Sequence, residues 1–215
     1  MTKELWRLGD QYEGQTIDPA TCDPDPVVEV RHWLASAVAY PIEQANAMTL
    51  ATVDDRGRPA ARIVLLKEID ARGFVFFTNY ESRKGHDLAA HPSAALVLFW
   101  EPLHRQIRIE GAIEKVEAEA SDTYFASRPR GSQIGAIASP QSEVIESRTA
   151  LEAMVAKVER THGDAALPRP SYWGGYRVVP DAIELWQGQR SRLHDRVVYR
   201  RASAEQAWTR ERVAP

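Results

Sequence analysis

The sequence has little cysteine, little imbalance of charge and no long apolar run. Cys22 is its only cysteine, which excludes an intrachain disulfide and a zinc site of several cysteines, and favours a reducing compartment. The 27 Lys and Arg residues nearly balance the 30 Asp and Glu residues, so the charge predicts no broad nucleic-acid surface. The longest apolar stretch, residues 94–100, is too short for a bilayer, and residues 1–10 lack the apolar run of a signal peptide. We expect a cytoplasmic protein without metal, membrane or nucleic-acid partners.

The composition is that of a globular domain. Hydrophobic residues make up 44% and charged residues 27% of the chain, close to the averages for globular proteins. Residues 1–24 are polar and irregular, and prolines stand at positions 19, 24 and 26. We therefore predict a mobile arm over residues 1–24 and a single domain over residues 25–215.

Hydrophobic periodicity predicts a mainly β protein with flanking helices. Asp25 and Pro26 are typical of a helix start, and apolar residues then recur at helical spacing until Pro41. Alternating runs separated by turn residues predict strands at 50–53, 62–66, 74–78, 94–100, 105–116, 176–179, 183–186 and 197–201. Further helices are predicted at 81–90, at 118–126 and from 139 onward. Two successive hairpins over 50–78 indicate an antiparallel meander, and the whole pattern an antiparallel barrel of the α+β class.

Cationic residues mark two stretches that are suited to anions. Arg62 and Lys67 stand at the ends of an apolar strand, and positions five apart on a strand face opposite sides, so we expect them to serve different sites. Ser82 is a candidate helix cap, and with Arg83 and Lys84 it would form an anion pocket at a helix start. Each segment alone also fits a buried strand with solvated ends or an ordinary capped surface helix.

Two further groups carry donors for an anion. Residues 139–142 predict a second helix N-terminus with polar side chains in its first turn. Tyr124, Arg128 and Ser132 are four apart and would share one side if the helix continued past Pro129. A phenol, a guanidinium and a hydroxyl together suit a phosphate, although chance produces such trios often.

Two alternating segments complete the candidate set. Residues 105–110 place Gln106 on a polar face, which fits either a half-exposed edge or the wall of a cleft. Arg192, His194 and Arg196 alternate, so on a strand they would share one face, a costly cluster unless an anion or acid lies opposite. A histidine between two arginines favours a functional role over a purely structural one.

Taken together, these motifs resemble one family. They are RIVLLK at 62–67, FTNYESRK at 77–84, SRPRGSQIGA at 127–136, PSYWGGY at 170–176, WQG at 186–188, RLHDR at 192–196, the pairs at 105–106 and 141–142, and the segment 208–215. The chain resembles the pyridoxine/pyridoxamine 5'-phosphate oxidases, which are FMN enzymes that make pyridoxal 5'-phosphate. The resemblance implies an antiparallel FMN-binding split β-barrel and a homodimer with FMN at the interface.

The resemblance also implies the site residues and the reaction. FMN would be held by Arg62, Ile63, Val64, Leu65, Leu66, Lys67, Phe77, Thr78, Arg83, Lys84, Gln106, Gln141, Ser142, Trp186 and Arg196. The small phosphorylated pyridine substrate would be held by Lys67, Tyr124, Arg128, Ser132, Arg192, Leu193 and His194. Arg192 and His194 would be the catalytic pair that orients the ring for hydride transfer from C4' to flavin N5. Dioxygen would then reoxidise the flavin and give hydrogen peroxide.

Two other functions stay open at this point. One is a flavin oxidase of the same fold that acts on another scaffold, as in phenazine biosynthesis, and the other is a non-catalytic protein that binds FMN or pyridoxal phosphate. The chain departs from the family in one place, because Gly9 stands where members commonly carry an arginine three residues before Tyr12. Arg7 is the nearest replacement for that lid contact.

Overall fold

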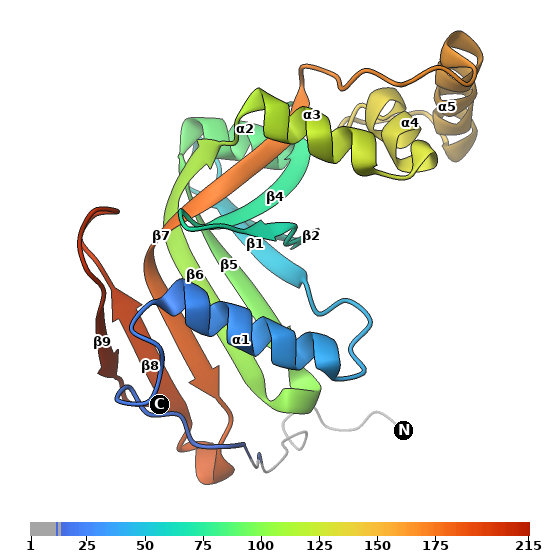
Figure 1. The fold of residues 1–215 in the computed structure, drawn as a ribbon. Helices are drawn as coiled ribbons and strands as arrows, with labels where there is room; N and C mark the ends of the chain where they lie inside the picture. Colours follow the sequence, from blue (N-terminus) through green and yellow to red (C-terminus); the bar gives the residue numbers. More distant parts are fainter. Residues whose placement is uncertain (1–11, 13) are drawn as a thin grey trace.

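The computed structural model describes residue 12 and residues 14–215. Nine strands in this part of the chain form one curled antiparallel sheet (Figure 1). They are β1 Ala47–Val53, β2 Pro59–Leu65, β3 Glu68–Ile69, β4 Phe74–Asn79, β5 Ser93–Trp100, β6 Arg105–Lys115, β7 Trp173–Gln187, β8 Asp195–Arg200 and β9 Thr209–Arg212. The strand order is β2-β1-β5-β6-β7-β4-β3, and β8 pairs with β7 and β9. The predicted antiparallel, mainly β architecture with flanking helices is confirmed.

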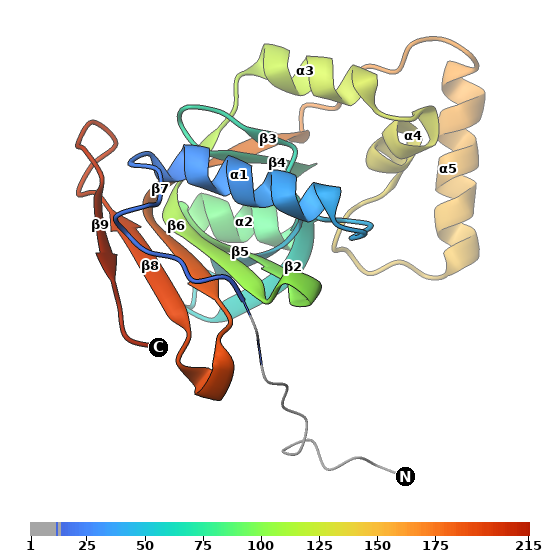
Figure 2. The same ribbon diagram turned by 60° about the horizontal axis from the view of Figure 1, so that its bottom comes forward.

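Five α-helices of the described chain flank the sheet. They are α1 Pro26–Ala39, α2 Arg83–Ala90, α3 Ala118–Ser127, α4 Arg130–Ala138 and α5 Arg148–His162. Figures 1 and 2 show α3, α4 and α5 gathered at one end of the molecule, away from β8 and β9, while α1 lies across the sheet. In the described residues, none of the helices has the length and apolar character needed to cross a membrane.

The core follows from the alternation along the central strands. The inward side chains of these strands are fully buried: Leu50, Leu96, Leu98, Ile107, Ile109, Ile183 and Leu185. Helix α1 packs Val30, Trp33 and Ala37 against them. Each buried Leu or Ile contributes roughly 1.5–3 kcal/mol of transfer free energy. A second, smaller core lies under α3–α5 and consists of Phe125, Ile134, Leu167 and Trp173. The functional site described below lies beside this smaller core.

Both predicted helix caps at the edges of this sheet are present. The carboxylate of Asp25 accepts a hydrogen bond of 2.9 Å from the Val27 N–H, and α1 ends before Pro41. The hydroxyl of Ser82 accepts from the Gly85 N–H at the start of α2. An alanine at position 85 would place its Cβ 2.0 Å from the Tyr80 carbonyl oxygen, so only glycine allows this close approach of helix and loop.

The predicted meander over residues 50–78 is wrong. Strands β1 and β2 form one hairpin and β3 and β4 another, but β4 pairs with β7 and not with β2. The chain crosses between the hairpins at two residues, where the Leu66 N–H donates to the Asn46 carbonyl and the Lys67 N–H donates to that of Val75. Alternation predicts a strand but not its partner, and β4 pairs with the distant β7 rather than with the neighbouring β2.

The helix predicted from residue 139 is also wrong, because residues 139–147 are not helical and α5 begins only after Ser147. The Ser147 hydroxyl caps α5 by accepting from the Ala150 N–H at 3.0 Å. Ser142 has a φ of 79°, in the left-handed region, which interrupts any helix through this segment. Val144 in this segment is fully exposed.

Two further differences concern the last strands. The strands predicted at 176–179 and 183–186 are one strand, β7, whose register shifts opposite Glu110 and Gly111. Pro180, which faces Gly111 in β7, lacks the N–H of a regular ladder. Strand β9 was not predicted, and it pairs with β8 along its whole length.

Candidate functional site

A cavity of about 620 Å³ opens between β2, β4, α3 and α4. Eleven residues predicted for a site line it: Ile63, Val64, Leu65, Lys67, Phe77, Thr78, Lys84, Tyr124, Arg128, Ser132 and Gln141. Its volume is within the range of ligand and cofactor sites in proteins. Lys84 and Arg128, which are 44 positions apart in the sequence, therefore line one cavity.

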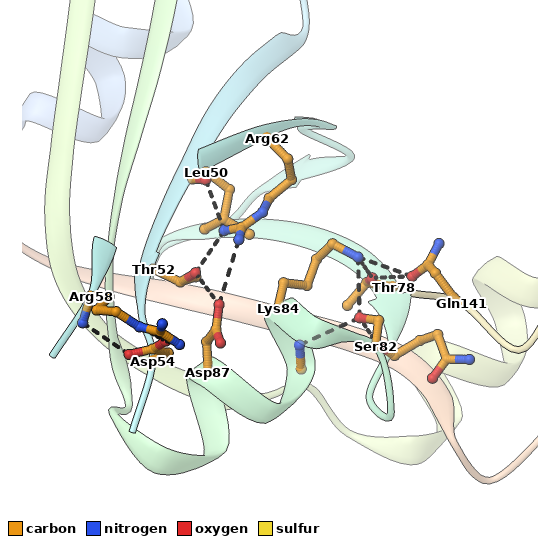
Figure 3. Close-up of polar contacts among 12 residues, drawn as sticks. Leu50, Thr52, Asp54, Arg58, Arg62, Thr78, Ser82, Lys84, Asp87 and Gln141 are labelled. Atoms are coloured by element: carbon orange, nitrogen blue, oxygen red, sulfur yellow. Dashed lines mark hydrogen bonds and ion pairs between the residues drawn. The ribbon is translucent and has the colours of Figure 1, made fainter. Parts of the chain in front are cut away.

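Lys84 marks one end of the cavity. Its ammonium donates to the Thr78 hydroxyl at 3.2 Å, the Ser82 hydroxyl at 3.1 Å and the Gln141 side-chain oxygen at 3.0 Å (Figure 3). Burial, and secondarily the charge of Arg62, lowers the pKa of Lys84 to about 8. The three hydrogen-bond partners of this ammonium are neutral oxygens, and the Asp87 carboxylate acts on it only as the smallest of the three influences on its pKa, so this end is suited to an anion.

Arg62 does not line the cavity but lies behind this end. Its guanidinium donates to the Leu50 carbonyl at 3.1 Å and to the Thr52 hydroxyl at 2.7 Å, and it lies 3.5 Å from the Asp87 carboxylate (Figure 3). The Thr52 hydroxyl donates to the same carboxylate at 2.6 Å. Burial lowers the pKa of Arg62. The expected separation of Arg62 from Lys67 is observed, since only Lys67 lines the cavity.

Arg128 marks the other end. Its guanidinium lies 4.7 Å from the centre of the Trp173 ring, and its Nη1 is buried without a hydrogen-bond partner. Burial lowers the pKa of Arg128. A buried guanidinium nitrogen that lacks an acceptor points to an anionic ligand, because leaving it unpaired is costly.

The trio of Tyr124, Arg128 and Ser132 does meet at the cavity, but not on one continuous helix. Helix α3 ends at Ser127, Arg128 is extended, and α4 begins at Arg130. The Gln133 side-chain amide donates to the Arg128 carbonyl at 2.8 Å and so holds the bend in place. The predicted end of the first helix before Pro129 is confirmed, and the condition of a continuous helix is not met, because a new helix starts after the extended residue 128.

Stacked aromatic rings also line the cavity. The rings of Phe77 and Tyr124 are 3.9 Å apart and nearly parallel, and Trp173 stacks 5.7 Å from Phe77. Lys67 lies 5.9 Å from the centre of the Tyr124 ring. Sequence reasoning missed Trp173 as a lining residue, although its place in the PSYWGGY motif was a usable signal. It also missed Asn79, Pro129, Gly135, Ala136 and Ser139.

A second group of predicted residues does not line this cavity. Gln106, Trp186 and Arg196 are adjacent across three strands, since Gln106 faces Trp186 and Trp186 faces Arg196 in the register. Next to Gln106 in the same row is Phe99, which is 52% exposed. The row therefore lies on the outer face of the sheet.

Arg192, Leu193 and His194 lie in the turn between β7 and β8, so the prediction that Arg192, His194 and Arg196 share a strand face is wrong. Residues 190–192 form a 3-10 turn, and Ser191 and Arg192 have positive φ of 56° and 61°. Only Arg196 is on a strand. Two left-handed residues without glycine give no signal in the sequence.

His194 nonetheless has a defined environment. Its Nδ1 accepts a hydrogen bond of 3.1 Å from the Gln189 N–H, and its ring lies 4.6 Å from that of Trp186. Burial, and secondarily Arg192, lowers the pKa of His194. The neutral imidazole thus has its proton on Nε2, which is free to donate.

Three further predicted residues lie outside the cavity. Leu66 is buried in the main core, Arg83 is an exposed first residue of α2, and Ser142 is exposed in the loop after α4. None of the three lines the cavity. The ring of Tyr12 lies edge-on to that of His194, with ring centres 5.7 Å apart, whereas Arg7 and Gly9 lie outside the described residues.

Comparison with known proteins places this geometry in a family. Residues 34–162 match the family described as pyridoxamine 5'-phosphate oxidase, and residues 173–215 match the pyridoxine 5'-phosphate oxidase C-terminal dimerisation region. The chain belongs to the pyridoxamine 5'-phosphate oxidase family. A protein of Burkholderia cenocepacia named pyridoxine/pyridoxamine 5'-phosphate oxidase is 58% identical over 95% of each chain. One of the same name from Paraburkholderia phytofirmans is 53% identical over 98% of this chain and 99% of its own.

Solved structures agree on the fold. PhzG from Burkholderia lata, in complex with tetrahydrophenazine-1-carboxylic acid, has a TM-score of 0.87 at 30% identity and covers 94% of this chain and 99% of its own. A pyridoxamine 5'-phosphate oxidase-related, FMN-binding protein from Nostoc punctiforme has a TM-score of 0.71 at 17% identity, with 94% of this chain and all of its own covered. The predicted split barrel is thereby confirmed.

As a member of this family, the chain is a flavoprotein of the oxidoreductase type with FMN as its cofactor. The cavity fits that cofactor on structural grounds. The Lys84 ammonium has only neutral oxygen partners, and apolar side chains such as Ile63 and Leu65 form one wall beside it. A phosphate and a flat ring system require this combination of a cationic end and an apolar wall.

Proposed function

We propose that the chain is a pyridoxine/pyridoxamine 5'-phosphate oxidase. The amine substrate, dioxygen and water would give pyridoxal 5'-phosphate, ammonia and hydrogen peroxide, and the alcohol with dioxygen would give the aldehyde and hydrogen peroxide. The observation that carries the proposal is the pair of anion-binding ends in one cavity, at Lys84 and at Arg128. Two ends of this kind suit two phosphorylated molecules, and the relatives that are 58% identical bear this name.

The two phosphates are assigned by their surroundings. Lys84, Thr78 and Gln141 bind the FMN phosphate, with Arg62 adding charge from behind. Arg128, Ser132, Tyr124 and Lys67 bind the substrate phosphate, because the unpaired Nη1 of Arg128 needs an acceptor there. The aromatic rings between the two ends leave a flat space for the stacked ring systems.

The second group of residues acts across a dimer. The outer face of the sheet exposes Ile63 by 64% and Phe99 by 52%, and residues 173–215 match the family's dimerisation region. A second copy covering this face brings its own Gln106, Trp186 and Arg196 to the flavin. Each site then contains side chains of both subunits, in agreement with the absence of these three residues from the cavity lining of one chain.

His194 and Arg192 orient the substrate ring. With Nδ1 engaged by the Gln189 N–H, the Nε2–H of His194 donates to a polar group of the pyridine and fixes its rotation. Arg192 is exposed on the turn and supplies a charge-assisted hydrogen bond to the same ring. FMN, when bound, supplies the two-electron acceptor for C4' of the substrate. Positioning of this kind is worth several kcal/mol when the reacting atoms are held at about 3–3.5 Å.

Anaerobic reduction tests the proposal directly. The purified FMN-loaded protein should lose its flavin absorption when pyridoxamine 5'-phosphate or pyridoxine 5'-phosphate is added without air, and regain it with air while pyridoxal 5'-phosphate accumulates. Unphosphorylated pyridoxine is the matched control, and it should reduce the flavin far more slowly. A flavin that none of these compounds reduces would indicate a binding protein without this activity.

A second candidate is favoured by the likeness to PhzG at a TM-score of 0.87. A carboxylate could pair with Arg128 in place of a phosphate, so a flavin oxidase acting on a reduced tricyclic carboxylic acid fits the same end of the cavity. Adding such a compound in the anaerobic assay distinguishes the two functions. Faster flavin reduction by the tricyclic acid than by pyridoxamine 5'-phosphate would favour this alternative.

A further inference from the structure

The guanidinium of Arg196 is held from two sides by its own chain. Its Nη1 donates to the Ala214 carbonyl at 2.7 Å, and its Nη2 donates to the Glu184 carboxylate at 2.6 Å. The Arg196 side chain is 27% exposed and that of Glu184 is 10% exposed, so the ion pair is shielded on one side only. These contacts use two of the five guanidinium N–H groups and leave three for a ligand.

Residues 213–215, here called the tail, contact both the backbone and the side chain of Arg196. The Val213 N–H donates to the Arg196 carbonyl at 3.1 Å, directly after β9 has paired with β8. Figure 2 shows β9 running beside β8, with the chain end next to it. Ala214 and Pro215 are exposed, so the tail adds little to the hydrophobic core. Its contribution to the molecule is the pair of hydrogen bonds to Arg196.

A free arginine side chain loses conformational entropy, at a cost in free energy, when it is fixed on a ligand. The Ala214 carbonyl lowers that cost without neutralising the guanidinium, since a carbonyl carries no net charge. Glu184 is shared with Arg108, whose Nη1 lies 3.7 Å away. The tail therefore orients one side of the Arg196 guanidinium, and Glu184 fixes the other side.

We propose that the tail and Glu184 position Arg196 of one subunit for the FMN bound by the other. The inference rests on the proposed function, in which Arg196 contacts the flavin. It assigns to residues 213–215 a role in cofactor binding that acts through one side chain rather than through the core.

The test measures FMN dissociation constants of the apo-dimer by quenching of flavin fluorescence. A chain that ends at Arg212 should bind FMN about threefold to tenfold more weakly, the value of one lost hydrogen bond. The full-length Ala214→Gly variant is the matched control and should bind as the unaltered chain does, because the carbonyl at position 214 remains and no new charge is added. In the Arg196→Ala background, the same shortening to Arg212 should have no further effect, since the tail acts through that side chain.

The outcomes distinguish a failure of the proposed role of Arg196 from a failure of the role of the tail. If Arg196→Ala alone leaves the FMN dissociation constant unchanged, the assignment of Arg196 in the proposed function fails and the inference with it. If Arg196→Ala weakens FMN binding but the chain ending at Arg212 binds normally, only the role of the tail is refuted. Equal losses on shortening with and without Arg196 would also refute it, because they would indicate a general effect on the fold.

Light scattering establishes that each variant is a dimer. Should the chain ending at Arg212 be monomeric, Glu184→Gln decides instead. Weaker FMN binding by Glu184→Gln in the presence of Arg196, and no effect in the Arg196→Ala background, supports the positioning role. An equal effect in both backgrounds overturns it.

Discussion

Replacing Arg128 by methionine should weaken substrate binding without weakening the fold. Arg128 stacks on Trp173 at 4.7 Å, and a methionine keeps apolar contact with that ring. The substitution removes a buried Nη1 that has no hydrogen-bond partner among residue 12 and residues 14–215, and with it an unfavourable desolvation cost. The melting temperature of the apoprotein should therefore stay the same or rise.

The substrate should respond in the opposite way. A lost charge-assisted hydrogen bond to phosphate is worth about 1.5–3 kcal/mol, so the KM for pyridoxamine 5'-phosphate should rise roughly tenfold to a hundredfold or more. The FMN dissociation constant should change little, because Lys84 at the other end of the cavity is untouched. Steady-state kinetics, flavin fluorescence and thermal unfolding of the same preparation measure all three quantities. A variant with wild-type KM, or one that loses FMN but keeps its substrate affinity, would refute the assignment of the two ends.

Three other substitutions probe different parts of the site. Lys84→Met should weaken FMN binding about tenfold to a hundredfold at pH 7. The pKa of Lys84 is lowered to about 8, so its ammonium loses a proton above that pH. The FMN affinity of the wild type should therefore fall by up to about tenfold per pH unit above pH 8, and that of the variant should not. Gly85→Ala should lower stability by about 1–3 kcal/mol in thermal or denaturant unfolding, because its Cβ would meet the Tyr80 carbonyl, and unchanged unfolding would disprove the need for glycine. His194→Ala should slow anaerobic flavin reduction on the order of a hundredfold in stopped flow while FMN stays bound, and a wild-type rate would rule out its orienting role.

The positions of most strands and of two helix caps could be predicted from the sequence because they depend on residues only a few positions away along the chain. Alternation fixes which residues of β6 are buried, and Ser82 satisfies amides a few residues away. Strand partners could not be predicted, since β4 pairs with a segment that is about a hundred residues distant. The helix α4 was hidden by Pro129, Gly131 and Gly135, which are poor helix formers that tertiary packing on Phe125 and Trp173 overrides.

Some residues of the candidate site could likewise be predicted from the sequence, and others could not. The motif residues of the cavity could be found from the sequence, and the trio around Arg128 meets there despite the break at residue 128. The shared face of Arg192 and His194 could not, because it assumed a strand where the backbone turns through left-handed residues. The proposed place of Trp186 and Arg196 at a flavin depends on a second copy, and no pattern within one chain encodes such a contact.

The small core under α3–α5 supports the side of the cavity formed by α3 and α4, and we expect this side to open more readily than the sheet. Helix α5 has no buried residue in the described chain, and four buried side chains hold this region together. Its free energy of local opening should therefore be well below that of the sheet, so amide hydrogens of α4 and α5 should exchange faster than those of β5 and β6. FMN contacts Gln141 in the proposed site, and binding only to the closed form stabilises it in proportion to the logarithm of ligand concentration. Limited proteolysis of residues 139–147 should slow as FMN is added, with half of the protection reached near the dissociation constant. The flavin would then hold this end of the molecule shut as well as carry electrons.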